Sequence, residues 1–195
     1  MNFLTYRSEV DSLRAISIIL VIFYHLNLSF FSGGFIGVDI FFVVSGYLIT
    51  SLIIKEIKHE KFKIFNFLER RIRRIIPALF LMLVFTTIIS VFLFSPNFFL
   101  EYIDSLIATV IFVSNYYFFN NINYFEFSSE LKPLLHTWSL AIEEQFYILF
   151  PLIFIILRKN FLYIFFTILF LFILSLLFSQ WAGNFTFSYP FLDDN

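Results

Sequence analysis

The chain has 195 residues, of which 60% are hydrophobic and only 14% are charged. A soluble domain carries about 25% charged residues, so this composition excludes an ordinary soluble fold and favours an integral protein of the lipid bilayer. The net charge of −1 predicts no attraction to nucleic acid. The absence of cysteine excludes disulfides, thiolate nucleophiles and thiolate metal sites.

Long apolar blocks predict about five membrane-spanning helices. They cover residues 13–28, 35–54, 75–94, 134–157 and 161–178. Only a short Ser/Gly turn, residues 32–34, separates the first two blocks, which predicts an antiparallel helical hairpin. We therefore expect an all-α fold, a polytopic transmembrane helical bundle that forms one domain over residues 1–195.

Basic residues concentrate in one loop, residues 55–74, which holds eight of the chain's 13 lysines and arginines. The positive-inside rule places this loop in the cytoplasm, and the N-terminus with it. Residues 98–119 are apolar enough to span but include Glu101 and Asp104. If they span, the later Arg158 and Lys159 fall outside, against the rule, so we expect a re-entrant or interfacial helix near 98–119.

Two ionisable residues of the first apolar block share one helix face. Arg14 and His25 are eleven residues apart, which on an α-helix is three turns plus about 20°, or roughly 16 Å along the axis. Ionisable groups inside a membrane are costly and usually functional, which favours a functional role for His25. The structural alternatives are that Arg14 snorkels to the interface and His25 makes an interhelical hydrogen bond.

The second block supplies an acid at a similar depth. His25 and Asp39 are each seven residues from Ser32 in the turn, so the carboxylate of Asp39 could orient the imidazole. An acid in the first turn of a helix is equally well explained by the helix dipole. Gly37 and Gly46 are expected to allow close helix packing.

The basic loop ends in two arginines on one helix face, Arg71 and Arg74. Guanidinium pairs bind phosphate through parallel hydrogen bonds, which suits a phosphate-bearing ligand at the cytoplasmic mouth. The simpler alternative is that these arginines mark topology and attract anionic lipid headgroups.

The fourth block opens with a polar line on an otherwise apolar helix. Four side chains recur at helical spacing on one face: His136, Ser139, Glu143 and Tyr147. Packing alone does not readily explain this line, so we interpret it as functional or as the lining of a polar cavity, and its residues as candidates for an active centre. A structural ion-pair network with Arg14 or Lys132 is the alternative. His25, His136 and Glu143 could form a zinc site, but nothing in their spacing requires it, and no metal is predicted.

Together these motifs resemble the acyltransferase 3 family of bacterial inner-membrane O-acyltransferases, which modify lipopolysaccharide O-antigen and other cell-envelope glycans. The resemblance rests on four motifs in this order: Arg14-x10-His25, Gly34-Phe35-x-Gly37-Val38-Asp39, Arg71-x-x-Arg74, and His136-Thr137-Trp138-Ser139-Leu140 followed by Glu143-Glu144-Gln145-Phe146-Tyr147. No single motif would be specific, but the ordered set is.

The resemblance implies an activity and a division of roles. The donor would be cytoplasmic acyl-CoA, usually acetyl-CoA, as a co-substrate with no bound cofactor, and the acceptor a glycan hydroxyl at the outer face. By family likeness His25 is catalytic, and Glu143 lies in the active centre. Arg14, Arg71 and Arg74 would serve the donor. Asp39 or Glu143 would stabilise the imidazolium.

Family members have about ten spans, whereas about five are expected here, so the chain resembles the N-terminal half of such a membrane domain. We therefore expect a truncated acyltransferase. Two alternatives remain open: a proton-coupled transporter, since buried histidines and acids also relay protons, and an inactive fragment of an acyltransferase.

Overall fold

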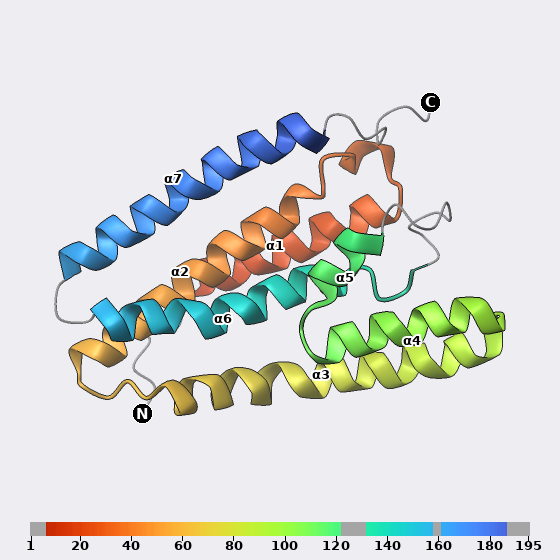
Figure 1. The fold of residues 1–195 in the computed structure, drawn as a ribbon, viewed down its shortest axis with the longest axis horizontal. Helices are drawn as coiled ribbons and strands as arrows, with labels where there is room; N and C mark the ends of the chain where they lie inside the picture. Colours follow the sequence, from red (N-terminus) through yellow and green to blue (C-terminus); the bar gives the residue numbers. More distant parts are fainter. Residues whose placement is uncertain (1–6, 122–131, 158–160, 187–195) are drawn as a thin grey trace. The chain divides into compact units, whose positions relative to one another are not determined.

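The computed structural model describes residues 7–121, 132–157 and 161–186, and every regular element in these ranges is helical (Figure 1). The all-α prediction is therefore confirmed. The elements are, in chain order, α1 (Ser8–His25), η1 (Ser29–Phe31), α2 (Ile36–Lys58), α3 (Ile64–Leu93), α4 (Pro96–Val110), α5 (Ser114–Asn121), α6 (Thr137–Leu157) and α7 (Phe161–Thr186). The chain divides into two compact units, Met1–Pro151 and Leu152–Asn195, and the candidate site lies within the first.

In the described ranges, four helices are long and apolar enough to cross a bilayer: α2, α3, α6 and the segment Leu162–Trp181 of α7. An apolar helix of about 20 residues matches the hydrocarbon thickness. The remaining predicted span corresponds to α1. This helix has 18 residues, fewer than each of those four helices, and it includes the charged residues Glu9, Asp11 and Arg14. The prediction of about five spans agrees with these four helices and α1.

α1 and α2 form the predicted hairpin, joined through Asn27, whose φ is 52°, and the short 3-10 helix η1. Two glycines at the start of α2 allow close approach to α1. A Cβ on Gly37 would lie 2.9 Å from Val21 Cγ2, and a Cβ on Gly34 would lie 2.8 Å from Tyr24 Cβ. Both separations are too short for carbon atoms, so a side chain at either position would push the helices apart.

The prediction for Gly46 differs from what the structure contains. Nothing in the described part of the chain lies within 4 Å of a Cβ built on Gly46. The hydroxyl of Thr50 donates to the Gly46 carbonyl oxygen at 2.7 Å, a bond within α2 itself. Close packing therefore requires glycine at Gly37 but not at Gly46.

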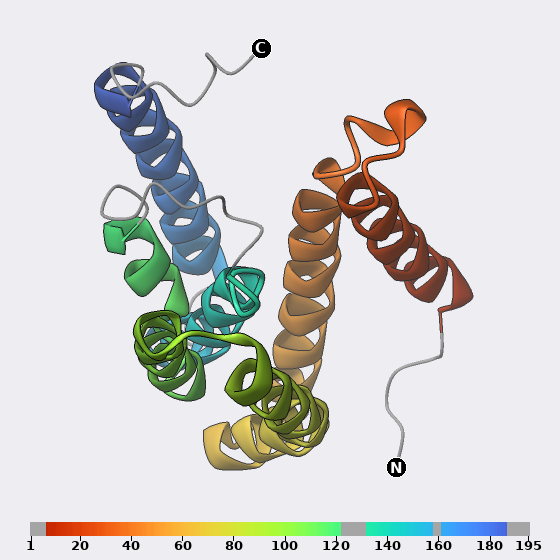
Figure 2. The same cartoon turned by 90° about the vertical axis from the view of Figure 1, so that its right-hand side faces the viewer.

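Residues 98–119 do not form one continuous helix. α4 has 15 residues, which is about 22 Å of helix and less than the hydrocarbon thickness of about 30 Å. It lies beside α3, and α5 follows after a break at residues 111–113 (Figures 1 and 2). The non-spanning character expected for this segment agrees with two short helices.

An apolar core joins α3, α4 and α5 to the residues before α6. Its buried members are Leu79, Leu83, Tyr102, Phe118 and Leu134. The Tyr102 hydroxyl reaches two threonines of α3, at 3.2 Å from Thr86 Oγ1 and 2.7 Å from Thr87 Oγ1. This buried polar group is thereby satisfied, as burial away from water requires.

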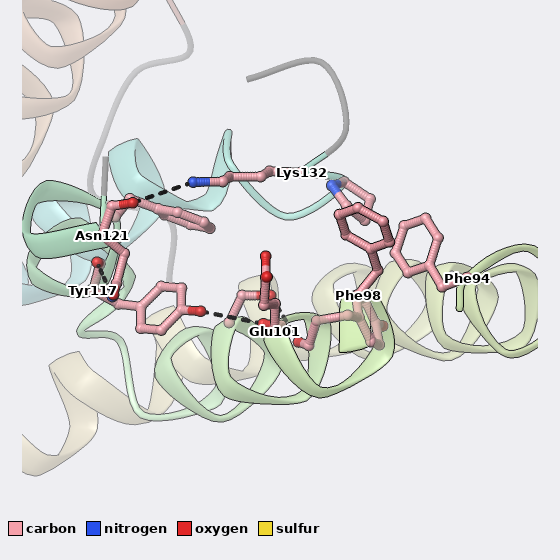
Figure 3. A pocket seen from close by; sticks show the side chains of 10 residues that line it. Phe94, Phe98, Glu101, Tyr117, Asn121 and Lys132 are labelled. Carbon is pink, nitrogen blue, oxygen red and sulfur yellow. Dashed lines mark hydrogen bonds between the residues drawn. The ribbon is translucent and has the colours of Figure 1, made fainter. Parts of the chain in front are cut away.

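A small cavity of about 30 Å³ lies beside this core, under the side chain of Lys132 (Figure 3). Tyr117 donates its hydroxyl to the Glu101 carbonyl oxygen at 3.2 Å, and the Lys132 ammonium reaches the Asn121 carbonyl oxygen at 3.5 Å. Burial, and then the charges of Asp104 and Glu101, raise the pKa of Tyr117, so it keeps the proton that it donates. The cavity has room for one or two water molecules, and no predicted site residue lines it.

Candidate active site

His25 is the last residue of α1 and has a defined ring orientation. Its Nδ1 lies 2.8 Å from the Val21 carbonyl oxygen, one turn earlier. A carbonyl can only accept, so Nδ1 carries the proton and donates it. In the neutral imidazole this leaves Nε2 with the free electron pair, which is the form that a general base needs.

The ring of His25 contacts the ring of His136, a histidine far from it in the sequence. His136 lies one residue before α6, and the two ring centroids are 4.3 Å apart at an interplanar angle of 82°. The structure therefore brings together two predicted site residues that are 111 positions apart in the chain.

At the other end of the site, Tyr147 of α6 joins the predicted acid to a predicted arginine. The Tyr147 hydroxyl donates to Glu143 Oε1, one turn earlier on α6. The guanidinium of Arg71 lies 5.7 Å from the centroid of the Tyr147 ring and 5.5 Å from that of Phe67. Two aromatic faces thus flank Arg71, an arrangement that favours a cation.

The three predicted arginines line one cavity of about 360 Å³, here called the arginine cavity. Arg14 reaches it from α1, with its guanidinium 5.8 Å from the Phe41 ring, and Arg71 and Arg74 reach it from α3. The remaining lining residues are Phe41, Ile75, Ala78, Leu79, Met82, Leu140, Glu143 and Tyr147. Arg14 Nε and Arg71 Nε are buried and make no hydrogen bond within the described ranges.

A second cavity of about 330 Å³, here called the serine cavity, lies between α1, α2 and α6. Its lining is mostly apolar and consists of Ser17, Ile18, Val21, Ile22, Gly37, Val38, Phe41, Phe42, Ser139, Leu140 and Glu143. Phe41, Leu140 and Glu143 line both cavities, so the two adjoin. The serine cavity reaches Val21, whose carbonyl holds His25. Together the cavities run from the arginines to Val21, one turn before His25, and His25 itself lines neither cavity.

The polar line predicted on α6 follows this path. Ser139 lines the serine cavity, Glu143 lines both, and Tyr147 lines the arginine cavity. His136 and Tyr147 are eleven residues apart, the same spacing as Arg14 and His25. α1 and α6 therefore present matched stretches of about 16 Å that run in opposite directions, with the histidines at one end.

Asp39 stands apart from this arrangement. It lies in the first turn of α2 and is exposed. In the described part of the chain, no hydrogen bond joins Asp39 to His25, whose Nδ1 uses a backbone carbonyl instead. Its proposed role beside the imidazole stays a prediction. No three histidine, aspartate or glutamate side chains among the described residues are grouped closely enough to hold a metal ion.

Sequence reasoning missed the aromatic surroundings of the arginines and the polar contacts behind α6. Phe67 precedes Arg71 by four residues, a spacing that already puts both on one helix face. Gln145 donates to Phe112 and Asn115, which are polar contacts to another segment of the chain. For the contacts of Gln145, the sequence offered one signal: the amide side chains of Asn115 and Gln145 stand in segments that are otherwise rich in apolar residues.

Comparison with known proteins places the chain in a family. The model of the family described as "Acyltransferase domain" matches residues 7–194. O-acetyltransferase OatA of Staphylococcus aureus (strain NCTC 8325 / PS 47) is 44% identical over 158 residues, which is 80% of this chain and 26% of that protein. Peptidoglycan O-acetyltransferase OatA of Listeria monocytogenes (strain EGD-e) is 46% identical over 156 residues, 79% of this chain and 25% of that protein.

These relatives extend well beyond the matched region, since the chain spans about a quarter of the length of each. No solved structure matches the chain. The family match covers nearly all of the sequence and includes every residue of the arginine and serine cavities. The chain belongs to the acyltransferase 3 family, as the order of its four motifs indicates.

Proposed function

We propose that this chain carries the catalytic centre of a membrane O-acetyltransferase, which moves an acetyl group from acetyl-CoA to a hydroxyl of peptidoglycan. The observation that carries the proposal is the pair of adjoining cavities, with three arginines at one end and His25 beyond the other. Acetyl-CoA has the matching chemistry, because its phosphates are anionic and its pantetheine arm is uncharged. The guanidiniums of Arg14, Arg71 and Arg74, which line the arginine cavity, suit the phosphates.

The proposed acceptor follows from one relative's name. The Listeria protein is named a peptidoglycan O-acetyltransferase, and the chain is 46% identical to it over the matched region. This supports peptidoglycan over lipopolysaccharide O-antigen among the cell-envelope glycans that the sequence resemblance suggests. Both acceptors would present the same group, a sugar hydroxyl.

The chemistry assigned to His25 is general base catalysis. Nε2 takes the proton of the acceptor hydroxyl while the hydroxyl oxygen attacks the thioester carbonyl carbon. The carbon–sulfur bond then breaks, and CoA leaves as a thiolate that recovers the proton from the imidazolium. A transient acetyl-imidazole on Nε2 is the two-step version, in which the acetyl group is carried from donor to acceptor. Glu143 supplies the negative charge that stabilises the imidazolium, with Asp39 as the second candidate.

The proposed placement is a bacterial cytoplasmic membrane with the arginine cavity open to the cytoplasm, where acetyl-CoA is made. The basic residues of the segment 55–74, which the structure divides among the end of α2, a short connection and the first turns of α3, support this orientation through the positive-inside rule. Family membership favours acyl transfer over the proton-coupled transport that the same buried groups would otherwise suggest.

The test is production of the chain in a bacterium that lacks peptidoglycan O-acetyltransferases, followed by measurement of acetate that mild base releases from purified peptidoglycan. We expect ester-linked acetate with the unaltered chain and its loss with His25→Ala, at equal protein level in the membrane. The double variant Arg71→Ala, Arg74→Ala should lose it too. His59→Ala is the matched control, because His59 is the residue after the last turn of α2 and lines neither cavity.

Two results would contradict the proposal. One is acetate at the level of the empty vector with the unaltered chain, which would favour an inactive fragment. The other is unchanged acetylation in His25→Ala.

A further inference from the structure

The break between α4 and α5 is held in an uncommon backbone conformation. Phe112 has a φ of 56°, the left-handed region that bulky residues seldom adopt. Its N–H donates to the Thr109 carbonyl oxygen at 3.1 Å, and the Val113 N–H donates to the Ala108 carbonyl oxygen at 2.8 Å. This is the hydrogen-bond pattern of a helix that ends at a left-handed residue, a position where glycine is usual. A phenylalanine there implies support from the surroundings.

That support comes from α6. Gln145 Nε2 donates to the Phe112 carbonyl oxygen at 2.9 Å and to Asn115 Oδ1 at 3.0 Å. Asn115 Nδ2 donates in return to Gln145 Oε1 at 3.3 Å. We call these contacts among Phe112, Asn115 and Gln145 the amide clasp. All of its side-chain members are at least partly buried, where an unpaired amide would be costly.

Hydroxyl contacts extend the clasp to the first residue of α6. Thr137 Oγ1 lies 2.9 Å from Thr109 Oγ1, and the Ser114 hydroxyl donates to the Thr137 carbonyl oxygen at 2.9 Å. Gln145 is two residues from Glu143, about 200° around the helix, so the clasp and the cavities use opposite sides of α6. On the side of α6 that faces away from the cavities, the end of α4 and the start of α5 therefore bind α6 through hydrogen bonds.

The held end of α6 carries a site residue. His136 directly precedes Thr137, and its ring meets the ring of His25 on α1 at 4.3 Å. That ring contact joins two separate helices, so it depends on where α6 begins. We propose that Asn115 and Gln145 are positioning residues, whose amide clasp fixes the start of α6 and so holds His136 against His25. The inference rests on the proposed function only for the chemistry of His136, and its test does not require activity.

The test uses the absence of cysteine from the chain. The pair Phe42→Cys, Trp138→Cys reports on α2 and the start of α6, because the two rings are 6.4 Å apart. The pair Tyr24→Cys, Phe35→Cys reports on the α1–α2 hairpin, where the rings are 5.8 Å apart. Each pair is cross-linked in membranes with a short bifunctional thiol reagent, with and without a change in the clasp.

The change is Gln145→Asn, which shortens the side chain by one methylene and separates the two amides. We expect the rate of cross-linking to fall at least about tenfold for the α2–α6 pair and to stay the same for the hairpin pair. One lost net hydrogen bond gives that factor, and Gln145 takes part in three. Adding Asn115→Gln restores the combined length of the two amides and should recover most of the rate. Asn121→Ala is the matched control, because the Asn121 amide donates within its own segment, to the Tyr117 carbonyl oxygen.

Each remaining outcome counts against the proposal. Unchanged cross-linking of both pairs in Gln145→Asn would mean that the clasp does not position α6. A fall in both pairs would mean that it supports the whole bundle and not the start of α6. If the rate does not recover in the double variant Gln145→Asn, Asn115→Gln, the slower cross-linking of Gln145→Asn would come from the smaller side chain and not from the lost contact between the two amides. None of these outcomes depends on whether the chain transfers acetyl groups.

Discussion

At the scale of single residues, the site is built from groups whose partners fix their chemistry. The Val21 carbonyl holds the proton of His25 on Nδ1, so no carboxylate is needed to leave Nε2 free for the proposed base catalysis. Glu143 accepts a hydrogen bond from Tyr147, and this bond ties the acid to the ring beside Arg71. A backbone carbonyl therefore fixes the orientation of His25 at one end of the candidate site, and a contact between two side chains of α6 fixes that of Glu143 at the other.

The bond from Tyr147 to Glu143 leads to a prediction. Tyr147→Phe keeps the ring beside Arg71 and removes only the hydroxyl, so Glu143 loses a partner that orients it. Hydrogen bonds to charged groups contribute about 1.5–3 kcal/mol, so acetylation of peptidoglycan should fall by tenfold or more if Glu143 acts in the transition state. Base-released acetate per unit of membrane protein measures the effect.

Tyr163→Phe serves as the control for that variant, because Tyr163 is an exposed tyrosine of α7. Equal acetylation in Tyr147→Phe and Tyr163→Phe would remove Glu143 from the proposed chemistry.

Residues on one helix could be predicted from sequence, and partners across helices could not. The shared faces of Arg14 with His25, and of Ser139 with Glu143, follow from the period of 3.6 residues alone. The contact of His25 with His136 needs the packing of two helices, which no spacing within one segment contains. The pairing of Asp39 with His25 stays a prediction for the same reason, since equal depth in a hairpin does not determine which way a side chain points.

At the scale of helices, close approach depends on a few glycines at the start of α2. The expectation from sequence treated Gly37 and Gly46 alike, because both follow a small-residue pattern. The structure separates them, since Gly37 faces the backbone of α1 at Ser17 and Gly46 faces no described atom within 4 Å. Sequence alone could not make this distinction because it depends on which side of α2 meets α1.

The two glycines form a matched pair for experiment. Gly37→Ala would overlap the Ser17 carbonyl and Val21 and should lower the free energy of unfolding by about 1–3 kcal/mol. Gly46→Ala should raise it by about 0.5–1 kcal/mol, because alanine loses less conformational entropy than glycine in a helix. Thermal unfolding of both variants in one detergent measures the difference, and equal midpoints would contradict the packing described for α1 and α2.

At the scale of the whole chain, composition predicted the class of protein, whereas the orientation that charge predicts stays a prediction. Helix content and number of spans followed from apolar blocks, which is the strongest signal that a membrane imposes on a sequence. For the segment 98–119, apolar content alone suggested a span, and only the charges before and after it favoured a non-spanning segment. The structure agrees, because this segment forms two short helices, α4 and α5. The corner between those two helices was not predictable, because Phe112 has none of the usual sequence signals of a turn.

The orientation of the chain can be tested directly with single cysteines. Glu60 lies just after α2 in the basic loop and Phe30 lies in η1 at the opposite end of α2, and both are exposed. If the loop is cytoplasmic, a membrane-impermeant thiol reagent applied to intact cells should label Phe30→Cys and should reach Glu60→Cys only after the cells are opened. Because the chain has no cysteine of its own, all labelling reports the introduced residue. The reverse pattern would open the arginine cavity to the outside, away from acetyl-CoA, and would contradict the proposed direction of transfer.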